Sequence, residues 1–141
     1  MTAMQRTWLE DIAPRECADL LESSWLGRLG VTVDGHPEIF PVNHVFDRAT
    51  GSIVFPTNAR TKLHSALDEA LVAFEVDGVL ADEVVGWSVL VIGPAIEVTD
   101  PDTIARALAL RRAAWAVSEH THWLRIEPIK MTGRRIYLVE G

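Results

Sequence analysis

A single cysteine, Cys17, stands among the 141 residues, so the chain forms no internal disulfide. No apolar run approaches the roughly 20 residues that span a bilayer, and the first residues do not join a basic segment to an apolar one as a secretory signal does. Cations are scarce as well, with 13 Lys and Arg against 20 Asp and Glu. We therefore expect a cytoplasmic protein with neither membranes nor nucleic acid among its partners.

The composition is that of one globular domain, residues 1–141. Hydrophobic residues make up 48% of the chain and charged residues 23%, and the length suffices for a sizeable core. No internal repeat, low-complexity tract or linker divides it. Because the net charge is −7, any site for an anion must be a local cluster of cations.

Strand patterns dominate the chain, and turns of hairpin length join them. Crossover helices at regular spacing are missing, which excludes a doubly wound parallel sheet. Antiparallel strands of this length tend to close on themselves and so remove their edges. The expected strands are residues 26–33, 37–46, 52–55, 71–78 and 83–99, with two more within 121–140 around the turn KMTG. The expected helices are residues 13–24, 60–67 and 101–115.

Prolines mark two irregular places in this pattern. Pro41 lies within the strand 37–46 and has no N–H for a ladder, so the strand is bulged or at an edge there. Gly93 and Pro94 predict a bend within the long strand 83–99.

The segment FPTNARTKLHSAL, residues 55–67, concentrates polar groups where a strand gives way to a helix. Hydroxyls, an amide and two cations before a helix start are typical of a phosphate site, because free N–H groups and full charges favour an anion. The alternative is that Thr61 caps the helix while Arg60 and Lys62 extend into solvent.

The order of the segments adds a resemblance. From about Leu26 to Ile136, five segments follow one another along the chain. They are GRLGVTVDGHPEIFPVNHVF, SIVFPTNARTKLHSAL, VAFEVDG, GWSVLVIGPAIEV and RIEPIKMTGRRI. This set resembles the pyridoxamine 5′-phosphate oxidase-like family of the FMN-binding split β-barrel superfamily. The resemblance implies a mainly β protein, a six- to seven-stranded antiparallel split β-barrel with flanking helices. It also implies an FMN-dependent oxidoreductase that is a homodimer with the cofactor at its interface and acts on a small molecule.

The same resemblance implies which residues bind FMN. The flavin ring would lie along the strand that contains Pro41, Val42, Asn43 and His44. The phosphate would be held by Thr57, Asn58, Arg60, Thr61 and Lys62. A further strand would pass the ring or the phosphate with Trp87, Ser88 and Val89. The second subunit would contribute Trp123, Arg125 or Arg134.

Several alternatives stay open at this point. A deazaflavin could occupy the same groove, although its acidic tail would favour a more basic surface. A non-catalytic flavin or haem binder is also compatible with the sequence. His44 either orients a substrate or makes a structural hydrogen bond, and one of Asn43 and His44 is expected to face the ring. The pair His120 and His122 has no further ligand nearby, so we expect no metal. Pyridoxine phosphate oxidases carry a longer C-terminal segment that grips the substrate, so the substrate does not follow from the resemblance.

Overall fold

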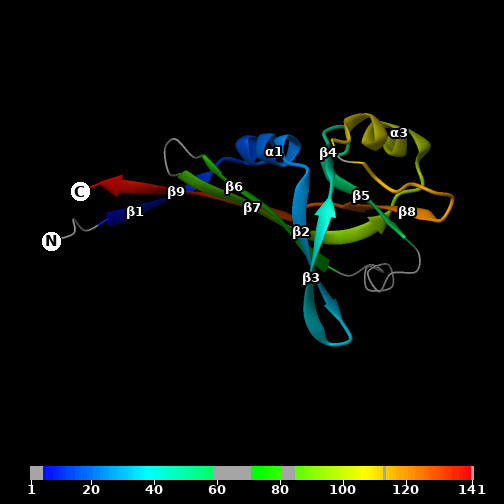
Figure 1. Ribbon diagram of the computed structural model, residues 1–141, viewed down its shortest axis with the longest axis horizontal. Coiled ribbons are helices and arrows are strands. Elements are labelled where there is room, and N and C mark those ends of the chain that lie inside the picture. The colour runs from blue at the N-terminus through cyan, green and yellow to red at the C-terminus, as the bar shows by residue number, and fades with distance from the viewer. Residues whose placement is uncertain (1–4, 59–70, 81–84, 113, 141) are drawn as a thin grey trace.

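The computed structural model describes residues 5–58, 71–80, 85–112 and 114–140, and these residues form nine strands and two helices (Figure 1). The strands are β1 (Gln5–Ile12), β2 (Leu26–Val33), β3 (His36–Asn43), β4 (Val45–Asp47), β5 (Ser52–Asn58), β6 (Leu71–Leu80), β7 (Val85–Glu97), β8 (Thr121–Ile126) and β9 (Lys130–Glu140). The helices are α1 (Pro14–Ser23) and α3 (Pro101–Leu110). The helix expected over residues 60–67 lies outside the described residues.

The strands form one antiparallel sheet that curls into a half-barrel, which confirms the predicted split-barrel architecture. Along the sheet the order is β3-β2-β6-β7-β8-β5-β4. β9 pairs with β7 as well, and β1 pairs with β9, so the two ends of the described chain run side by side in Figure 1. Within the described residues, β3 and β4 are therefore the two ends of this order.

Alternation along the central strands builds the core. Leu29, Phe74 and Val89 come from β2, β6 and β7, point to the concave face and are fully buried. α1 covers this face: Pro14 lies in its first turn, and Cys17 and Leu21, one turn apart, are both buried against the sheet. Each such apolar side chain stabilises the fold by roughly 1.5–3 kcal/mol.

β2 and β3 form a tight hairpin. Asp34 and Gly35 both have positive φ angles, 49° and 82°, which an Asp-Gly turn tolerates. β3 pairs with β2 without interruption from His36 to Asn43, so Pro41 marks no bulge. It is accommodated because β3 is an edge strand, and the chain breaks at His44 instead.

β7 pairs with two different strands, β9 and β8, in successive parts of its length. Its residues from Gly86 to Ile92 pair with β9, whereas Ala95, Ile96 and Glu97 pair with β8. The change of partner falls at Gly93 and Pro94, where a bend was predicted. A side chain at Gly93 would collide with the backbone of Glu127, so glycine allows the chain between β8 and β9 to approach.

Several elements differ from the prediction. The final turn consists of residues 127–129, and the expected turn KMTG lies inside β9 because it pairs with β7. β5 continues past Pro56 to Asn58, held by β8. α3 begins at Pro101, as predicted, behind the N-cap Asp100, but it ends at Leu110 and not at residue 115. β1 is a strand that the sequence pattern did not reveal.

Candidate functional site

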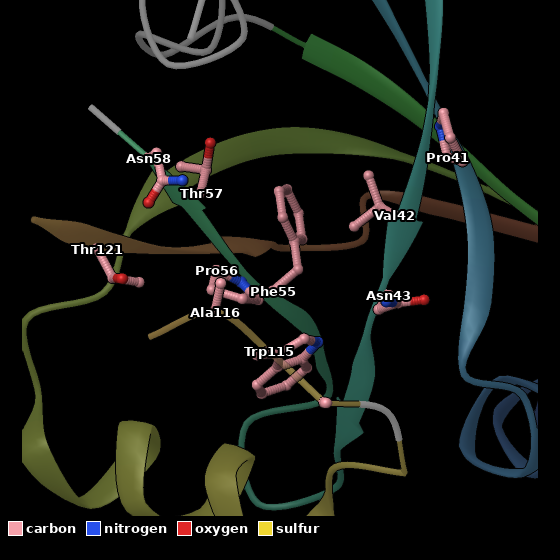
Figure 2. Close-up of a pocket in the computed structure, with 11 residues that line it drawn as sticks. Pro41, Val42, Asn43, Phe55, Pro56, Thr57, Asn58, Trp115, Ala116 and Thr121 are labelled. Carbon is pink, nitrogen blue, oxygen red and sulfur yellow. The ribbon is translucent and has the colours of Figure 1, made fainter. Parts of the chain in front are cut away.

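A pocket of about 270 Å³ opens between the edge strand β3 and strand β5 (Figure 2). We call it the seam pocket, because it lies between β3, at one end of the sheet order, and β5, the last strand but one at the other end. Its walls come from three parts of the chain that are distant in sequence. It is lined by Pro41, Val42, Asn43, Phe55, Pro56, Thr57, Asn58, Ala114, Trp115, Ala116 and Thr121.

The β3 wall offers backbone groups. The N–H of His44 donates to the carbonyl of Trp25 at 3.0 Å, which makes this a hydrogen-bonded pair of the β2–β3 ladder. Because hydrogen-bonded and non-hydrogen-bonded pairs alternate, Asn43 and Pro41 occupy non-hydrogen-bonded positions opposite Leu26 and Arg28. The N–H and C=O of Asn43 therefore point away from β2, on the side where the pocket lies. The pocket thus has a backbone donor and acceptor at its β3 edge.

The β5 wall contains the beginning of the predicted phosphate segment. Thr57 and Asn58 end β5 beside Thr121, which pairs with Asn58 across the sheet. The structure thus brings Thr57 and Asn58 together with Pro41, Val42 and Asn43 around one cavity. Arg60, Thr61 and Lys62 lie outside the described residues, so their phosphate role stays a prediction.

The third wall, Ala114 to Ala116, was not identified from the sequence. Trp115 contacts Trp123 edge to face, with ring centroids 5.4 Å apart. Its indole also lines the seam pocket, and its Nε1 is buried without a hydrogen-bond partner in the part of the chain that the structure describes. No spacing in the sequence relates residue 115 to β3 and β5, because the chain reaches them only after α3.

An ion pair anchors α3 above this wall. Asp47 at the end of β4 is buried and accepts from Arg106 Nε at 3.0 Å and Nη2 at 3.2 Å. Thr50 donates a third hydrogen bond at 2.8 Å. Burial opposes ionisation of Asp47, but the hydrogen bonds from Arg106 and Thr50 outweigh it and hold the pKa of this carboxyl below its usual value. The pair fixes the helix from which the third wall continues.

His44 does not line the seam pocket. Its ring is 1% exposed and stands edge to face with Phe74, with ring centroids 4.8 Å apart. Nε2 donates to the carbonyl of Leu21 at 3.2 Å, and Nδ1 has no partner among the described residues. Of the two neighbours, Asn43 is therefore the residue at the pocket, and His44 makes the structural hydrogen bond.

Three further predicted residues gather in a different place. Trp87, Ser88 and Arg134 line a groove of about 370 Å³ on the convex face of the sheet, together with Asp77 and Ile136. Ser88 and Arg134 are direct cross-strand partners. Within one chain this groove and the seam pocket are separate cavities.

The remaining predicted residues line neither cavity. Val89 is fully buried in the core because it alternates with Ser88 and Leu90 on β7. Trp123 is buried behind Trp115, and Arg125 lies 4.0 Å from Glu127. No cluster of metal-binding side chains occurs within residues 5–58, 71–80, 85–112 and 114–140. No helix in these ranges is long and apolar enough to cross a membrane.

Comparisons with known proteins agree with this geometry. An FAD-binding protein from Mycobacterium smegmatis has a similar structure, with 39% identity and a TM-score of 0.78 over 91% of this chain and 98% of that one. A protein from Corynebacterium glutamicum, proposed to be a pyridoxamine 5′-phosphate oxidase, is 32% identical with a TM-score of 0.74, over 94% and 96% of the two chains. An uncharacterised protein of Mycobacterium tuberculosis is 36% identical over 86% of this chain and 81% of its own length.

The sequence model of one family, described as pyridoxamine 5′-phosphate oxidase, matches residues 13–135. This range contains α1, the edge strand β3, the whole of β5 to β8 and most of β9, and hence every described wall of the seam pocket. The chain therefore belongs to the pyridoxamine 5′-phosphate oxidase family.

Proposed function

We propose that the seam pocket binds a flavin nucleotide and that the protein is a flavin-dependent oxidoreductase. The observation that carries this proposal is the convergence of Pro41, Val42 and Asn43 with Thr57 and Asn58 around one cavity. These two groups are the ones that the family resemblance assigns to the flavin ring and to its phosphate. The 39% identical relative, which is an FAD-binding protein, supports the same class of ligand.

The residues of the pocket suit this ligand. The outward N–H and C=O of Asn43 form a donor and acceptor pair that matches the carbonyl and imide groups at the polar edge of a flavin. Val42 and Pro56 supply apolar surface for the ring, and the buried Phe55 lies behind them. A bound flavin would supply the hydride and electron transfer, and the chain would supply binding, orientation and exclusion of water.

The choice between FMN and FAD depends on what lies beyond the phosphate. The sequence favours FMN, with Arg60, Thr61 and Lys62 as ligands of a terminal phosphate. The Mycobacterium smegmatis relative makes FAD the second candidate. We keep FMN as the proposed cofactor, and parallel titrations with FMN, FAD and a deazaflavin decide between the three.

The pocket is too small to enclose a whole flavin nucleotide, since small-molecule sites usually exceed about 300 Å³. A homodimer would complete it. The seam pocket lies beside the edge strand β3, and the groove of Trp87 and Arg134 lies over β6, β7 and β9. In a symmetric dimer that covers both, a two-fold axis would place the pocket of one copy against the groove of the other. Both sets of predicted residues would then contribute to one site.

A cavity-filling substitution tests the site directly. Ala116 is exposed and lines the pocket, so Ala116→Phe fills the space without disturbing the core. We expect the wild-type protein to bind FMN or FAD saturably, followed by flavin fluorescence, and Ala116→Phe to weaken binding about ten-fold or more. Ala109→Phe, on the exposed side of α3, is the matched control and should leave affinity unchanged. Saturable binding that Ala116→Phe does not alter would contradict the assignment of the site.

Catalysis is tested separately from binding. An oxidoreductase should oxidise NADH or NADPH in the presence of an electron acceptor when it is loaded with its flavin. Tight flavin binding without turnover, over a broad set of donors and acceptors, would instead identify a non-catalytic flavin binder.

A further inference from the structure

Trp115 is the one aromatic side chain of the third wall, and it has two distinct faces of contact. One is the edge-to-face contact with Trp123, whose ring is itself buried under α3. The other is the seam pocket, where the indole lies beneath Phe55 and Pro56 with its nitrogen turned toward the side of Asn43 (Figure 2). The contact with Trp123 holds the ring in place, so the direction of its N–H is fixed by the fold.

Packing alone does not explain why residue 115 is a tryptophan. An indole N–H that is buried usually finds a hydrogen-bond acceptor, because leaving a donor unpaired is unfavourable. Nε1 of Trp115 is buried and finds none among the described residues. A phenylalanine would provide the same contact with Trp123 without the unpaired donor. The unpaired N–H therefore points to an acceptor that binds in the seam pocket.

We infer that Trp115 is a ligand-binding residue that donates a hydrogen bond from Nε1 to an acceptor atom of the bound flavin nucleotide. This inference rests on the proposed function. The chemistry fits, because flavin nucleotides present carbonyl oxygens, ring nitrogens and phosphate oxygens, and an indole N–H is a donor only. Asn43 and Trp115 would then hold the ligand from opposite walls, one through its backbone and the other through its side chain.

The test compares Trp115→Phe with Trp8→Phe, a matched substitution at an exposed indole on β1. Trp115→Phe keeps an aromatic ring against Trp123 and removes the donor. We expect flavin affinity to fall about ten-fold in Trp115→Phe and to stay unchanged in Trp8→Phe. Thermal unfolding without ligand should show that Trp115→Phe is at least as stable as the wild type, since it removes an unpaired buried donor.

A second readout follows the N–H itself. In ¹⁵N-labelled protein, the indole resonance that disappears in Trp115→Phe should shift when FMN or FAD is added. Unchanged flavin affinity of Trp115→Phe, or an indole resonance that does not move at saturating flavin, would overturn the inference while leaving the proposed function standing. If the wild-type protein binds no flavin at all, the proposed function fails and the inference falls with it.

Discussion

At the scale of single residues, His44 shows how burial decides a side chain's chemistry. The carbonyl of Leu21 can only accept, so Nε2 must carry the proton and Nδ1 is left as a bare acceptor. Protonation would place an N–H at Nδ1 where no described residue can receive it. Burial lowers the pKa of His44 to about 4, and the hydrogen bond to Leu21 only partly offsets this effect. His44 is therefore neutral at physiological pH.

This neutrality predicts a pH dependence of stability. The pKa of His44 is lower in the folded protein than its ordinary value of 6.5, so the unfolded chain binds the proton more readily. Above pH 6.5 the neutral His44 makes its full contribution to the free energy of unfolding. As the pH falls toward 4, this free energy decreases by about 3 kcal/mol in total. His44→Gln retains an N–H for Leu21 and should remove this part of the pH dependence. Chemical denaturation of both proteins between pH 7 and 4 measures it, and parallel curves would refute the prediction.

At the scale of elements, the sequence predicts those parts whose stabilising contacts are local. α1 and β2 match the prediction closely because a proline start, an apolar spacing of one turn and an Asp-Gly turn are all contained within the segments themselves. β1 was not predicted from the sequence because its pairing partner, β9, lies at the other end of the chain. The prediction of a turn at KMTG was wrong because these residues pair with β7 as part of a strand. The close approach of the chain to Gly93 places the turn earlier in the sequence.

Some residues of the candidate site were likewise predicted from the sequence, and others were not. Pro41, Asn43, Thr57 and Asn58 were assigned because the ordered set of segments resembles the family, and Thr57 and Asn58 also begin a polar segment typical of a phosphate site. Trp115 was not assigned, since its place in the pocket depends on how α3 is anchored to β4. A contact between residues 47 and 106 leaves no local pattern in the sequence.

The Asp47–Arg106 pair yields a prediction for this element. Asp47→Asn removes the charge that accepts from Arg106 and Thr50, and should destabilise the protein by about 1.5–3 kcal/mol. The control is Asp19→Asn, which disrupts an exposed pair with Arg48 and should cost less than about 1 kcal/mol. Urea denaturation at pH 7 compares the two variants, and equal losses would show that the buried pair has no special role.

At the scale of the whole molecule, the two faces of the sheet differ in what they leave uncovered. The concave face is filled by the core and by α1, whereas the convex face exposes apolar side chains along several neighbouring strands. These residues are Leu9, Leu26, Ile39, Leu71, Val79, Leu90 and Ile136. Among them Arg28 contacts Glu75 at 2.5 Å and Asp77 at 2.7 Å. An apolar face of this kind is normally covered by a partner, which supports the proposed homodimer.

A charge placed on this face should therefore separate the subunits. Leu90 is 39% exposed and lies directly opposite Glu75 on the neighbouring strand, so Leu90→Glu adds repulsion to lost apolar contact. We expect sedimentation velocity to show a dimer for the wild type and a monomer for Leu90→Glu. Val117→Glu, at an exposed position outside the sheet, should remain dimeric. A wild-type monomer that binds flavin tightly would contradict a site shared between subunits.

The central claim is that a flavin nucleotide binds between β3 and β5. A crystal structure of the protein grown with FMN, and in parallel with FAD, tests it most directly. The account predicts flavin density in the seam pocket, in contact with Asn43 on one wall and Trp115 on another. Flavin density elsewhere, with the seam pocket filled only by solvent, would contradict it.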